Sequence, residues 1–80
     1  MPYDSKAFGV VLSRLRARQN ISQERFAISA EIARSHLTEL ENGKKVPRLD
    51  TLFRLAEALE MRPSELLRLA EEEMGLRQDR

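Results

Sequence analysis

The sequence contains no cysteine and no tryptophan, and its only histidine is His36. Without cysteine the chain can form neither a disulfide nor a thiolate zinc site, and a single histidine is too few for a transition-metal site. We therefore expect no metal and no other cofactor. The absence of disulfides also suits a reducing compartment, so a cytoplasmic location is expected.

Long apolar segments are also missing. The apolar run at residues 9–12 (GVVL) is far shorter than the roughly 20 residues that cross a bilayer, and the first eight residues have no signal-peptide pattern. We expect no membrane partner. A chain of 80 residues forms one small domain without room for a deep substrate cleft. No second histidine, cysteine or spaced carboxylate pair accompanies His36, so neither an enzyme nor a small-molecule substrate is expected.

Charged residues make up 34% of the chain, but the net charge is only +1. The two signs are unevenly distributed. Residues 1–48 contain nine Lys or Arg and five Asp or Glu, whereas residues 49–80 contain five and eight. The N-terminal part could therefore face phosphates while the C-terminal part makes a different contact.

Apolar residues recur at helical spacing along nearly the whole chain, and no stretch alternates as a strand would. The pattern predicts an all-α fold, a compact bundle of five helices in a single domain over residues 1–80. Ser22 is expected to cap the second helix, and Gly43 and Gly75 to follow the third and the fifth. The helices are expected at about residues 6–19, 23–30, 33–42, 49–60 and 63–74.

The stretch FAISAEIARSHLTEL joins the second and third expected helices. Only about two residues, Glu31 and Ile32, are available for the connection, so the two axes must cross steeply. Ala27 is small enough to let the helices approach, and Ile32 can fill the turn. Leu37 and Leu40 would anchor the third helix to the core. The spacing therefore predicts a helix-turn-helix.

Three strings of the sequence, ISQERFA, RSHLTELENGKKVP and LDTLFRLAEAL, carry a family resemblance. Over roughly residues 8–68 the chain resembles the Cro/repressor-type, or xre-type, helix-turn-helix family. The resemblance implies a lambda-repressor-like bundle and a sequence-specific regulator of transcription, a repressor or controller, that binds double-stranded DNA. Three positions depart from the family pattern. Glu31 replaces the usual turn glycine, and Ala33 and Arg48 replace the usual helix caps, each at a cost of about 1 kcal/mol.

The third expected helix has a polar outward face. At about 100° per residue, Leu37 and Leu40 point to one side and the polar residues to the other. A helix of this width fits the major groove of DNA, where Arg can bond guanine and Glu can accept from cytosine. The alternative is a face that is merely solvated. The resemblance places Arg34, Ser35 and Glu39 at the family's base-reading positions. The expected base-reading residues are Arg34, Ser35, Thr38 and Glu39.

Contacts to DNA phosphates are expected on both sides of this helix. Gln23 begins the second helix, where free N–H groups and the helix dipole favour an anion. The basic loop after Gly43 would set register and affinity, not sequence choice. Helix propensity for Gln23 and solubility for the loop are the alternative explanations. The expected phosphate-binding residues are Gln23, His36, Asn42, Lys44, Lys45 and Arg48.

Arg16 and Glu41 each flank the apolar stripe of a predicted helix, so both are expected to be partly buried where the first and third helices meet. We predict that they form an ion pair, and the family resemblance implies the same bridge. The role is structural, because removing one partner would leave a buried charge alone.

The fifth expected helix has more apolar residues than one core-facing stripe requires. Leu67, Leu69 and Met74 should be partly exposed, and a surplus of this kind marks a contact. We expect them to form the interface of a homodimer, whose two reading helices would lie about 34 Å apart. The alternative is that this helix completes the core of a monomer. In either case residues 71–73 (EEE) are expected to form a solvated face.

Two functions are compatible with this sequence. The first is the DNA-binding regulator. The second is a protein-interaction module, such as an antitoxin or a transcriptional adaptor, that uses the same fold. They differ in salt dependence, because binding to phosphates weakens steeply as salt rises and an apolar protein contact does not.

Overall fold

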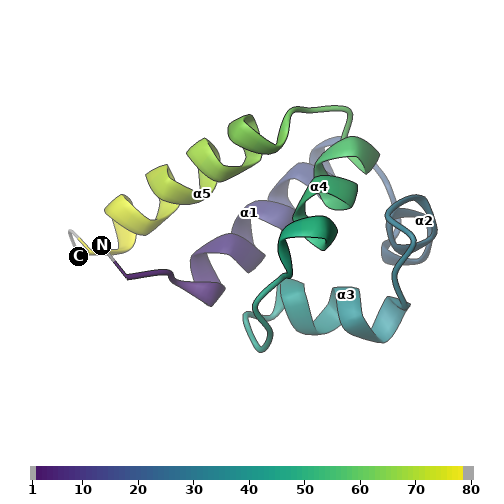
Figure 1. The fold of residues 1–80 in the computed structure, drawn as a ribbon, viewed down its shortest axis with the longest axis horizontal. Coiled ribbons are helices and arrows are strands. Elements are labelled where there is room, and N and C mark those ends of the chain that lie inside the picture. Colours follow the sequence, from purple (N-terminus) through teal and green to yellow (C-terminus); the bar gives the residue numbers. More distant parts are fainter. Residues whose placement is uncertain (1, 79–80) are drawn as a thin grey trace.

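The structure is a computed structural model that describes residues 2–78, with the side chains of residues 2–76. Helices make up most of this part of the chain and it contains no strand, so the predicted all-α fold is confirmed. The five helices are α1 (Ser5–Arg18), α2 (Gln23–Ser29), α3 (Arg34–Glu41), α4 (Leu49–Ala58) and α5 (Pro63–Gln78). The start of α1 and the end of α5 lie at the same end of the molecule (Figure 1).

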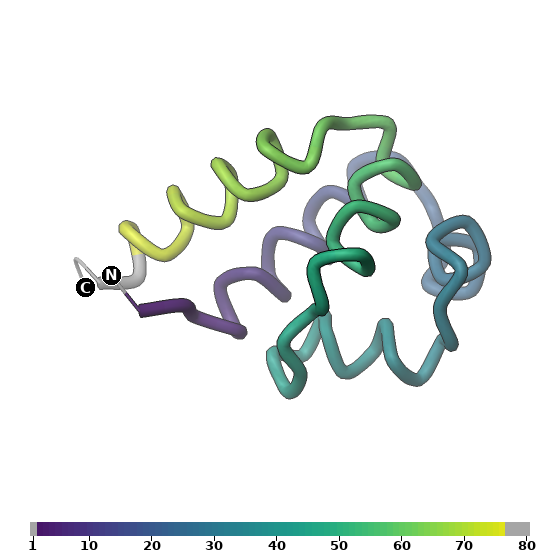
Figure 2. The backbone as a smooth tube through the Cα atoms, viewed as in Figure 1, coloured from purple at the N-terminus to yellow at the C-terminus, as the bar shows by residue number. Residues whose placement is uncertain are grey.

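Helix α1 is the central element of the bundle. It packs against α3 and against α5, while α4 packs against α5 and α2. Helices α3 and α5 lie on opposite sides of the molecule, as the backbone trace shows (Figure 2). Helix α3 therefore forms one edge of the bundle, with α1 and α2 behind it.

The first turns of the helices reflect the residues that precede them. The carboxylate of Asp4 accepts two hydrogen bonds from N–H groups at the start of α1, at 2.9 and 3.2 Å. The Ser22 hydroxyl accepts one from the first turn of α2 at 3.1 Å, as expected of an N-cap. No side chain caps α3 or α4, where the N-cap residues are Ala33 and Arg48. At both of these departures from the family pattern the N-cap residue therefore forms no side-chain hydrogen bond to the first turn of its helix.

Helices α1 to α4 all end in the same motif. The residue after each C-cap has a positive φ, between 57° and 74°, and the next N–H bonds back to a carbonyl of the last full turn. The positive-φ residues are Asn20, Glu31, Gly43 and Glu60. In three of the four cases the next residue is apolar and packs against the core, namely Ile21, Ile32 and Met61. This contact offsets the roughly 1 kcal/mol cost of a left-handed residue other than glycine.

One cluster of apolar side chains forms the core, and every helix contributes to it. The largest fully buried side chains are Phe8, Val11, Leu12, Phe26, Leu37, Leu40, Leu55 and Leu66. None of the helices in the described part is long and apolar enough to cross a membrane.

Helix α5 differs from the prediction in its length and in what it buries. It continues through Gly75 to Gln78, because glycine inside a helix costs only about 1 kcal/mol. The longer helix packs along α1. As a result Met74, expected to be partly exposed at a dimer interface, is 5% exposed and belongs to the core. Glu73, expected on a solvated face, is also buried and accepts a hydrogen bond from Arg14 at 2.9 Å.

The bounds of the other four helices lie within two residues of those predicted. Helix α1 begins one residue earlier than expected because Asp4 caps it, and it also ends one residue earlier. The predicted domain covered residues 1–80, of which residues 1, 79 and 80 lie outside the described residues.

Helices α1 and α3 approach each other closely at Gly9. A Cβ atom at this position would lie 2.7 Å from the carbonyl oxygen of Leu40 and closer still to that of Glu41. Both neighbours are backbone atoms of α3, which cannot move aside as a flexible side chain could. The absence of a side chain at Gly9 therefore sets the distance between α1 and α3.

We predict that Gly9→Ala lowers the free energy of unfolding by about 1 to 3 kcal/mol, because the added methyl group forces α1 and α3 apart. Gly75→Ala is the matched control. A Cβ there would meet nothing within 4 Å, so the helix-favouring alanine should raise the free energy of unfolding by about 0.5 to 1 kcal/mol. Urea denaturation of the three proteins measures both values, and equal stability of Gly9→Ala and wild type would contradict the close approach.

Candidate nucleic-acid interface

Helices α2 and α3 meet at a steep angle. In Figure 1, α2 is seen nearly end-on while α3 runs across the view. Glu31 has a φ of 58°, and the N–H of Ile32 donates to the carbonyl of Ala27 at 3.0 Å. The connection is longer than the two residues predicted. Helix α2 ends one residue earlier than expected and α3 begins one residue later. The side chain of Ile32 packs against the core and so holds the turn in place.

A buried carboxylate holds α3 to the two helices behind it. The side chain of Glu41 is only 3% exposed. Arg16, its predicted partner, forms a bidentate ion pair with it, in which Nε donates to Oε2 at 2.8 Å and Nη2 to Oε1 at 3.1 Å. Ser13 and Gln23 also donate to Oε1, at 3.2 and 2.8 Å. Glu41 thus connects α3 with α1 through two residues and with α2 through one.

The ion pair is satisfied on both sides. Arg16 uses its remaining nitrogen, Nη1, to donate to the carbonyl of Ile21 at 3.0 Å, just after the end of α1. In the described part of the chain no buried side-chain nitrogen or oxygen lacks a hydrogen-bond partner. A buried charge pair stabilises a fold only under this condition, since an unsatisfied partner costs several kcal/mol.

The side chains of Gln23, on α2, and Thr38, on α3, meet between the two helices. The amide nitrogen of Gln23 donates to Glu41, and its amide oxygen lies 3.4 Å from the hydroxyl of Thr38. The same hydroxyl lies 3.0 Å from the carbonyl oxygen of Arg34, the better placed acceptor for its single proton. Gln23, predicted to contact phosphate, therefore has one amide N–H committed inside the protein. Thr38, predicted to read bases, is half-buried with its hydroxyl engaged.

The outward face of α3 carries the other predicted base-reading residues. Arg34 and Ser35 are exposed in its first turn, and Glu39 is half-exposed one turn later. Leu37 and Leu40 are fully buried on the opposite face. The structure thus brings these three polar side chains to the edge of the molecule that α3 forms.

Predicted phosphate-binding residues follow α3 in the chain. Asn42 is the exposed C-cap of α3, and Lys44 and Lys45 are exposed in the loop before α4. The Arg48 side chain is 83% exposed, with its Nε 3.4 Å from a carboxylate oxygen of Asp50. Such an exposed ion pair contributes little, so Arg48 is available to another anion.

The charge state of Asp50 matters for Arg48, its neighbour. Desolvation acts to raise the pKa of Asp50, but the N–H of Thr51 and the guanidinium groups of Arg48 and Arg54 lower it by more, so the pKa lies below its usual value. Asp50 therefore stays ionised at neutral pH and offsets part of the positive charge of the loop.

His36 is half-buried on α3, beside the outward face. Among the described residues, no three His, Asp or Glu side chains gather closely enough to hold a metal ion. The polar and charged side chains at this edge lie on one helix and a basic loop.

A helix-turn-helix family model matches residues 12–66, which contain the joint, the network and α3. The chain belongs to the Cro/C1-type helix-turn-helix family. The relatives below are named as control proteins or as a gene regulator. The predicted class of function, transcription regulation, is therefore confirmed.

Proteins similar to this chain include a control protein, a restriction-modification controller protein and a clp gene regulator. Control protein C.BamHI of Bacillus amyloliquefaciens is 30% identical over 61 residues, 75% of each chain. The restriction-modification controller protein C.AhdI of Aeromonas hydrophila is 34% identical, with a TM-score of 0.75 over 78% of this chain and 94% of its own. The clp gene regulator ClgR of Corynebacterium glutamicum is 26% identical, with a TM-score of 0.90 over 98% and 83%.

Two residues that support the joint were not predicted. Ser13 donates to Glu41, and its position three residues before Arg16, on the same face of α1, was a usable signal. Arg54 of α4 donates from Nε to the carbonyl of Ala30 at 3.1 Å, which satisfies the end of α2. No local pattern could have identified this bond, because its partners are 24 residues apart.

We predict that Arg16→Met lowers the free energy of unfolding by about 3 kcal/mol, because it leaves the Glu41 carboxylate buried without its cation. The double variant Arg16→Met with Glu41→Met should cost clearly less than the sum of the two single changes. Urea denaturation of the four proteins gives this coupling energy. Additive costs would mean that the two side chains do not depend on each other.

Proposed function

We propose that the chain is a cytoplasmic, homodimeric repressor or controller that binds an operator in double-stranded DNA, with α3 in the major groove. The observation that carries the proposal is the polar outward face of α3, fixed by the buried Glu41 network. A helix so held presents its side chains in one orientation, as base recognition requires. The relatives C.BamHI and C.AhdI, named as control proteins, support a regulator of this single-domain size.

Base recognition in this proposal centres on the start of α3, since the N-terminal residues of a recognition helix reach the base edges. Arg34 would donate two hydrogen bonds to one guanine, and Ser35 would contact a neighbouring base. Glu39 would accept from a cytosine amino group one turn further on. Thr38 has its hydroxyl occupied within the protein, so its methyl group is the part left to contact a thymine methyl.

Contacts to the phosphates would place α3 in register. Lys44, Lys45 and Arg48 would neutralise phosphates beside the groove, with Asn42 and His36 as uncharged or weakly charged donors. Gln23 keeps a second amide N–H that its bond to Glu41 does not use. A phosphate at that N–H would connect the DNA backbone directly to the network that orients α3.

We predict that Arg34→Ala relaxes discrimination at one base position of the operator by about 1 to 3 kcal/mol. The operator is first selected with the wild-type protein from a randomised DNA pool, and binding is then measured to every single-base change. Arg68→Ala is the control, because it removes the same charge from exposed α5, on the side away from α3. Unchanged preference at every position in Arg34→Ala would remove this residue from the base-reading set.

We predict that Lys44→Ala weakens binding to all DNA sequences about equally and reduces the slope of log affinity against log salt by about 1 per protomer. Titrations at several salt concentrations measure the slope. A change in the preferred sequence would contradict the phosphate role. A wild-type protein without salt-dependent DNA binding would instead favour the protein-interaction module, an antitoxin or adaptor, over the regulator.

A further inference from the structure

Lysine is scarce in this chain and is concentrated in one place. Of the 14 Lys and Arg residues only three are lysines, namely Lys6, Lys44 and Lys45. Lys6 lies in the first turn of α1, and the other two lie in the loop that follows α3. In Figure 1 the start of α1 lies beside this loop, at the edge of the molecule that α3 forms. The fold therefore gathers all three lysines, although Lys6 was not among the predicted phosphate-binding residues.

Gly43 shows how closely the loop and α1 approach each other. Its φ of 74° lies in the left-handed region. A Cβ atom at this position would lie 2.8 Å from both the Cα and the Cγ atom of Lys6, and 3.0 Å from its backbone nitrogen. The stem of the Lys6 side chain thus passes directly over Gly43, the residue before Lys44. Lys6 and Lys44 are therefore neighbours in space, and the absence of a side chain at Gly43 makes this possible.

The three lysines form a group of like charges. All three are exposed, and within the described residues none of them forms an ion pair. The carboxylate of Asp4 caps α1 by accepting hydrogen bonds from the N–H groups of Lys6 and Ala7. Neighbouring cations repel one another, and an anion bound between them removes this repulsion. The group is therefore suited to a partner that carries several negative charges.

The first turn of α1 is an unfavourable place for a cation. The positive end of the helix dipole favours acidic residues there and disfavours basic ones. The first turns of α2, α4 and α5 each contain an acidic residue, namely Glu24, Asp50 and Glu65. Those of α1 and α3 contain none, and Lys6 and Arg34 occupy them instead. The stability of α1 therefore does not explain Lys6, just as the stability of α3 does not explain Arg34.

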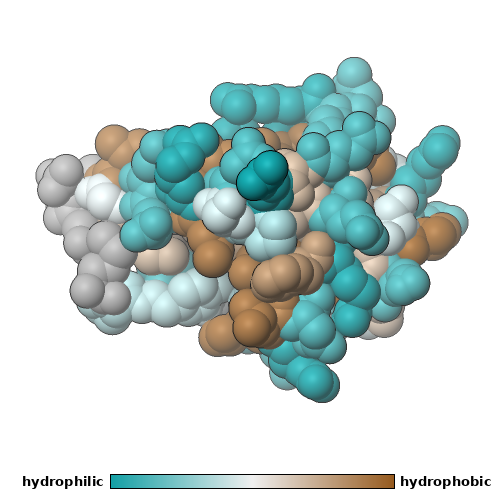
Figure 3. Space-filling view, turned by 45° about the horizontal axis from the view of Figure 1, so that its top comes forward, coloured by the Kyte–Doolittle hydropathy of each residue, from teal (hydrophilic) through white to brown (hydrophobic). Residues whose placement is uncertain are grey.

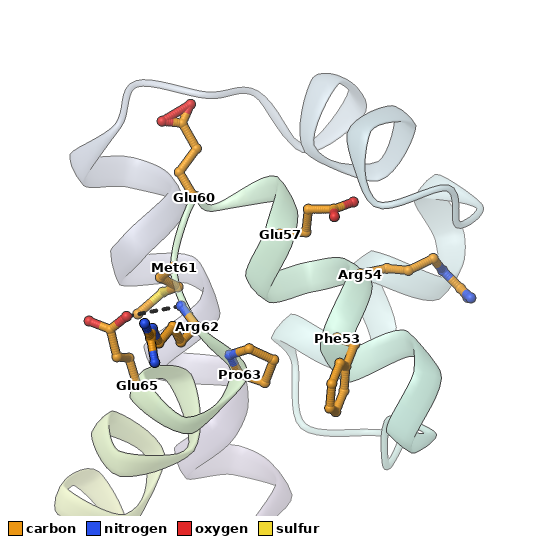
Figure 4. A pocket seen from close by; sticks show the side chains of 8 residues that line it. All are labelled: Phe53, Arg54, Glu57, Glu60, Met61, Arg62, Pro63 and Glu65. Carbon is orange, nitrogen blue, oxygen red and sulfur yellow. Dashed lines mark hydrogen bonds between the residues drawn. The ribbon is translucent and has the colours of Figure 1, made fainter.

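Other parts of the surface suit a chain of phosphates less well. On the face shown in Figure 3, apolar side chains gather in one region among hydrophilic ones. The hollow between α4 and the start of α5 is lined by Glu57, Glu60 and Glu65 together with Arg54 and Arg62 (Figure 4). Its three carboxylates would repel phosphates. The positive charge that phosphates require is thus concentrated at the edge where α1 meets the loop after α3.

We propose that Lys6 binds a phosphate of the DNA backbone beside those contacted by Lys44 and Lys45, so that the DNA interface extends from α3 and its loop onto α1. The inference rests on the proposed function, because it assigns a further residue to the same DNA-binding surface. Lysine suits the role, since its ammonium is a point charge on a flexible stem that can follow a phosphate. The planar guanidinium of Arg34 suits the fixed edge of a base instead.

The salt dependence of DNA binding by Lys6→Gln tests this role. We expect the variant to bind its selected operator and an unrelated duplex about 3- to 10-fold more weakly at low salt. The slope of log affinity against log salt should fall by about 1 per protomer. Unfolding would not account for this result, because removing a cation from the first turn favours the helix. Circular dichroism establishes that the variant is folded.

Two further variants serve as controls. Lys6→Arg keeps the positive charge and should keep the wild-type slope. Arg68→Gln removes the same charge from exposed α5, on the side away from α3, and should leave the slope nearly unchanged. A slope that falls equally in Lys6→Gln and Arg68→Gln would reflect net charge alone and would overturn the contact.

Acetylation of lysine amines gives a second and more direct measurement. The wild-type chain is treated with a limiting amount of acetic anhydride, free and bound to its selected operator, and mass spectrometry gives the extent of modification at each lysine. A phosphate held by the ammonium group shields it from the reagent. We expect the operator to slow acetylation of Lys6 together with that of Lys44. Protection of Lys44 without protection of Lys6 would overturn the inference.

These results are distinguishable from a failure of the proposed function. If the wild type selects an operator and Lys6→Gln retains the full salt slope, the contact from α1 is wrong and the regulator stands. A changed sequence preference in Lys6→Gln would likewise contradict a phosphate contact while leaving the regulator in place. If the wild type selects no DNA site and its binding does not depend on salt, the proposed function itself fails.

Discussion

The carboxylate of Glu41 is the point on which the arrangement of the first three helices depends. It lies at the end of α3 and accepts hydrogen bonds from Arg16 and Ser13 of α1 and from Gln23 of α2. A hydrogen bond to a charged group stabilises a fold by about 1.5 to 3 kcal/mol, and losing it inside the protein costs at least as much. Helix α3 cannot rotate or slide without breaking several of these bonds together. The side chains on its outer face are therefore held in one orientation before any partner binds.

The helix-turn-helix was predictable because its determinants are local in the sequence. The short connection forces a steep crossing, and Ile32 is apolar at the position where the end of α2 needs a contact with the core. The same reasoning explains why Glu31 is tolerated in place of glycine. Its left-handed conformation costs about 1 kcal/mol, but the hydrogen bond from the N–H of Ile32 to Ala27 and the packing of Ile32 remain intact. Asn20 and Glu60 occupy equivalent positions after α1 and α4.

The sequence could not predict the features that depend on contacts between residues far apart in the chain. Helical periodicity shows which faces are apolar, but it does not show which of several apolar faces a neighbouring helix covers. The length of α5 along α1 decides that Met74 is core, and Glu73 is buried because Arg14, 59 residues away in the chain, pairs with it. Of the apolar residues predicted to be partly exposed on α5, Met74 is buried, whereas Leu69 is half-buried and Leu67 is exposed. Helix α4 has apolar residues on two faces, and only packing shows that Leu49 and Phe53 belong to the uncovered one.

Helix α4 supports the turn that orients the reading helix. On its solvent side it carries Phe53, and at the next position Arg54 donates to the carbonyl of Ala30 at the end of α2. That carbonyl belongs to the turn that orients α3. The path from the solvent side of α4 to the joint therefore consists of one helix, one hydrogen bond and one tight turn. In the proposed homodimer the separation of the two α3 helices would determine the spacing of the two half-sites on DNA, and the rigid support of each α3 would keep that separation constant.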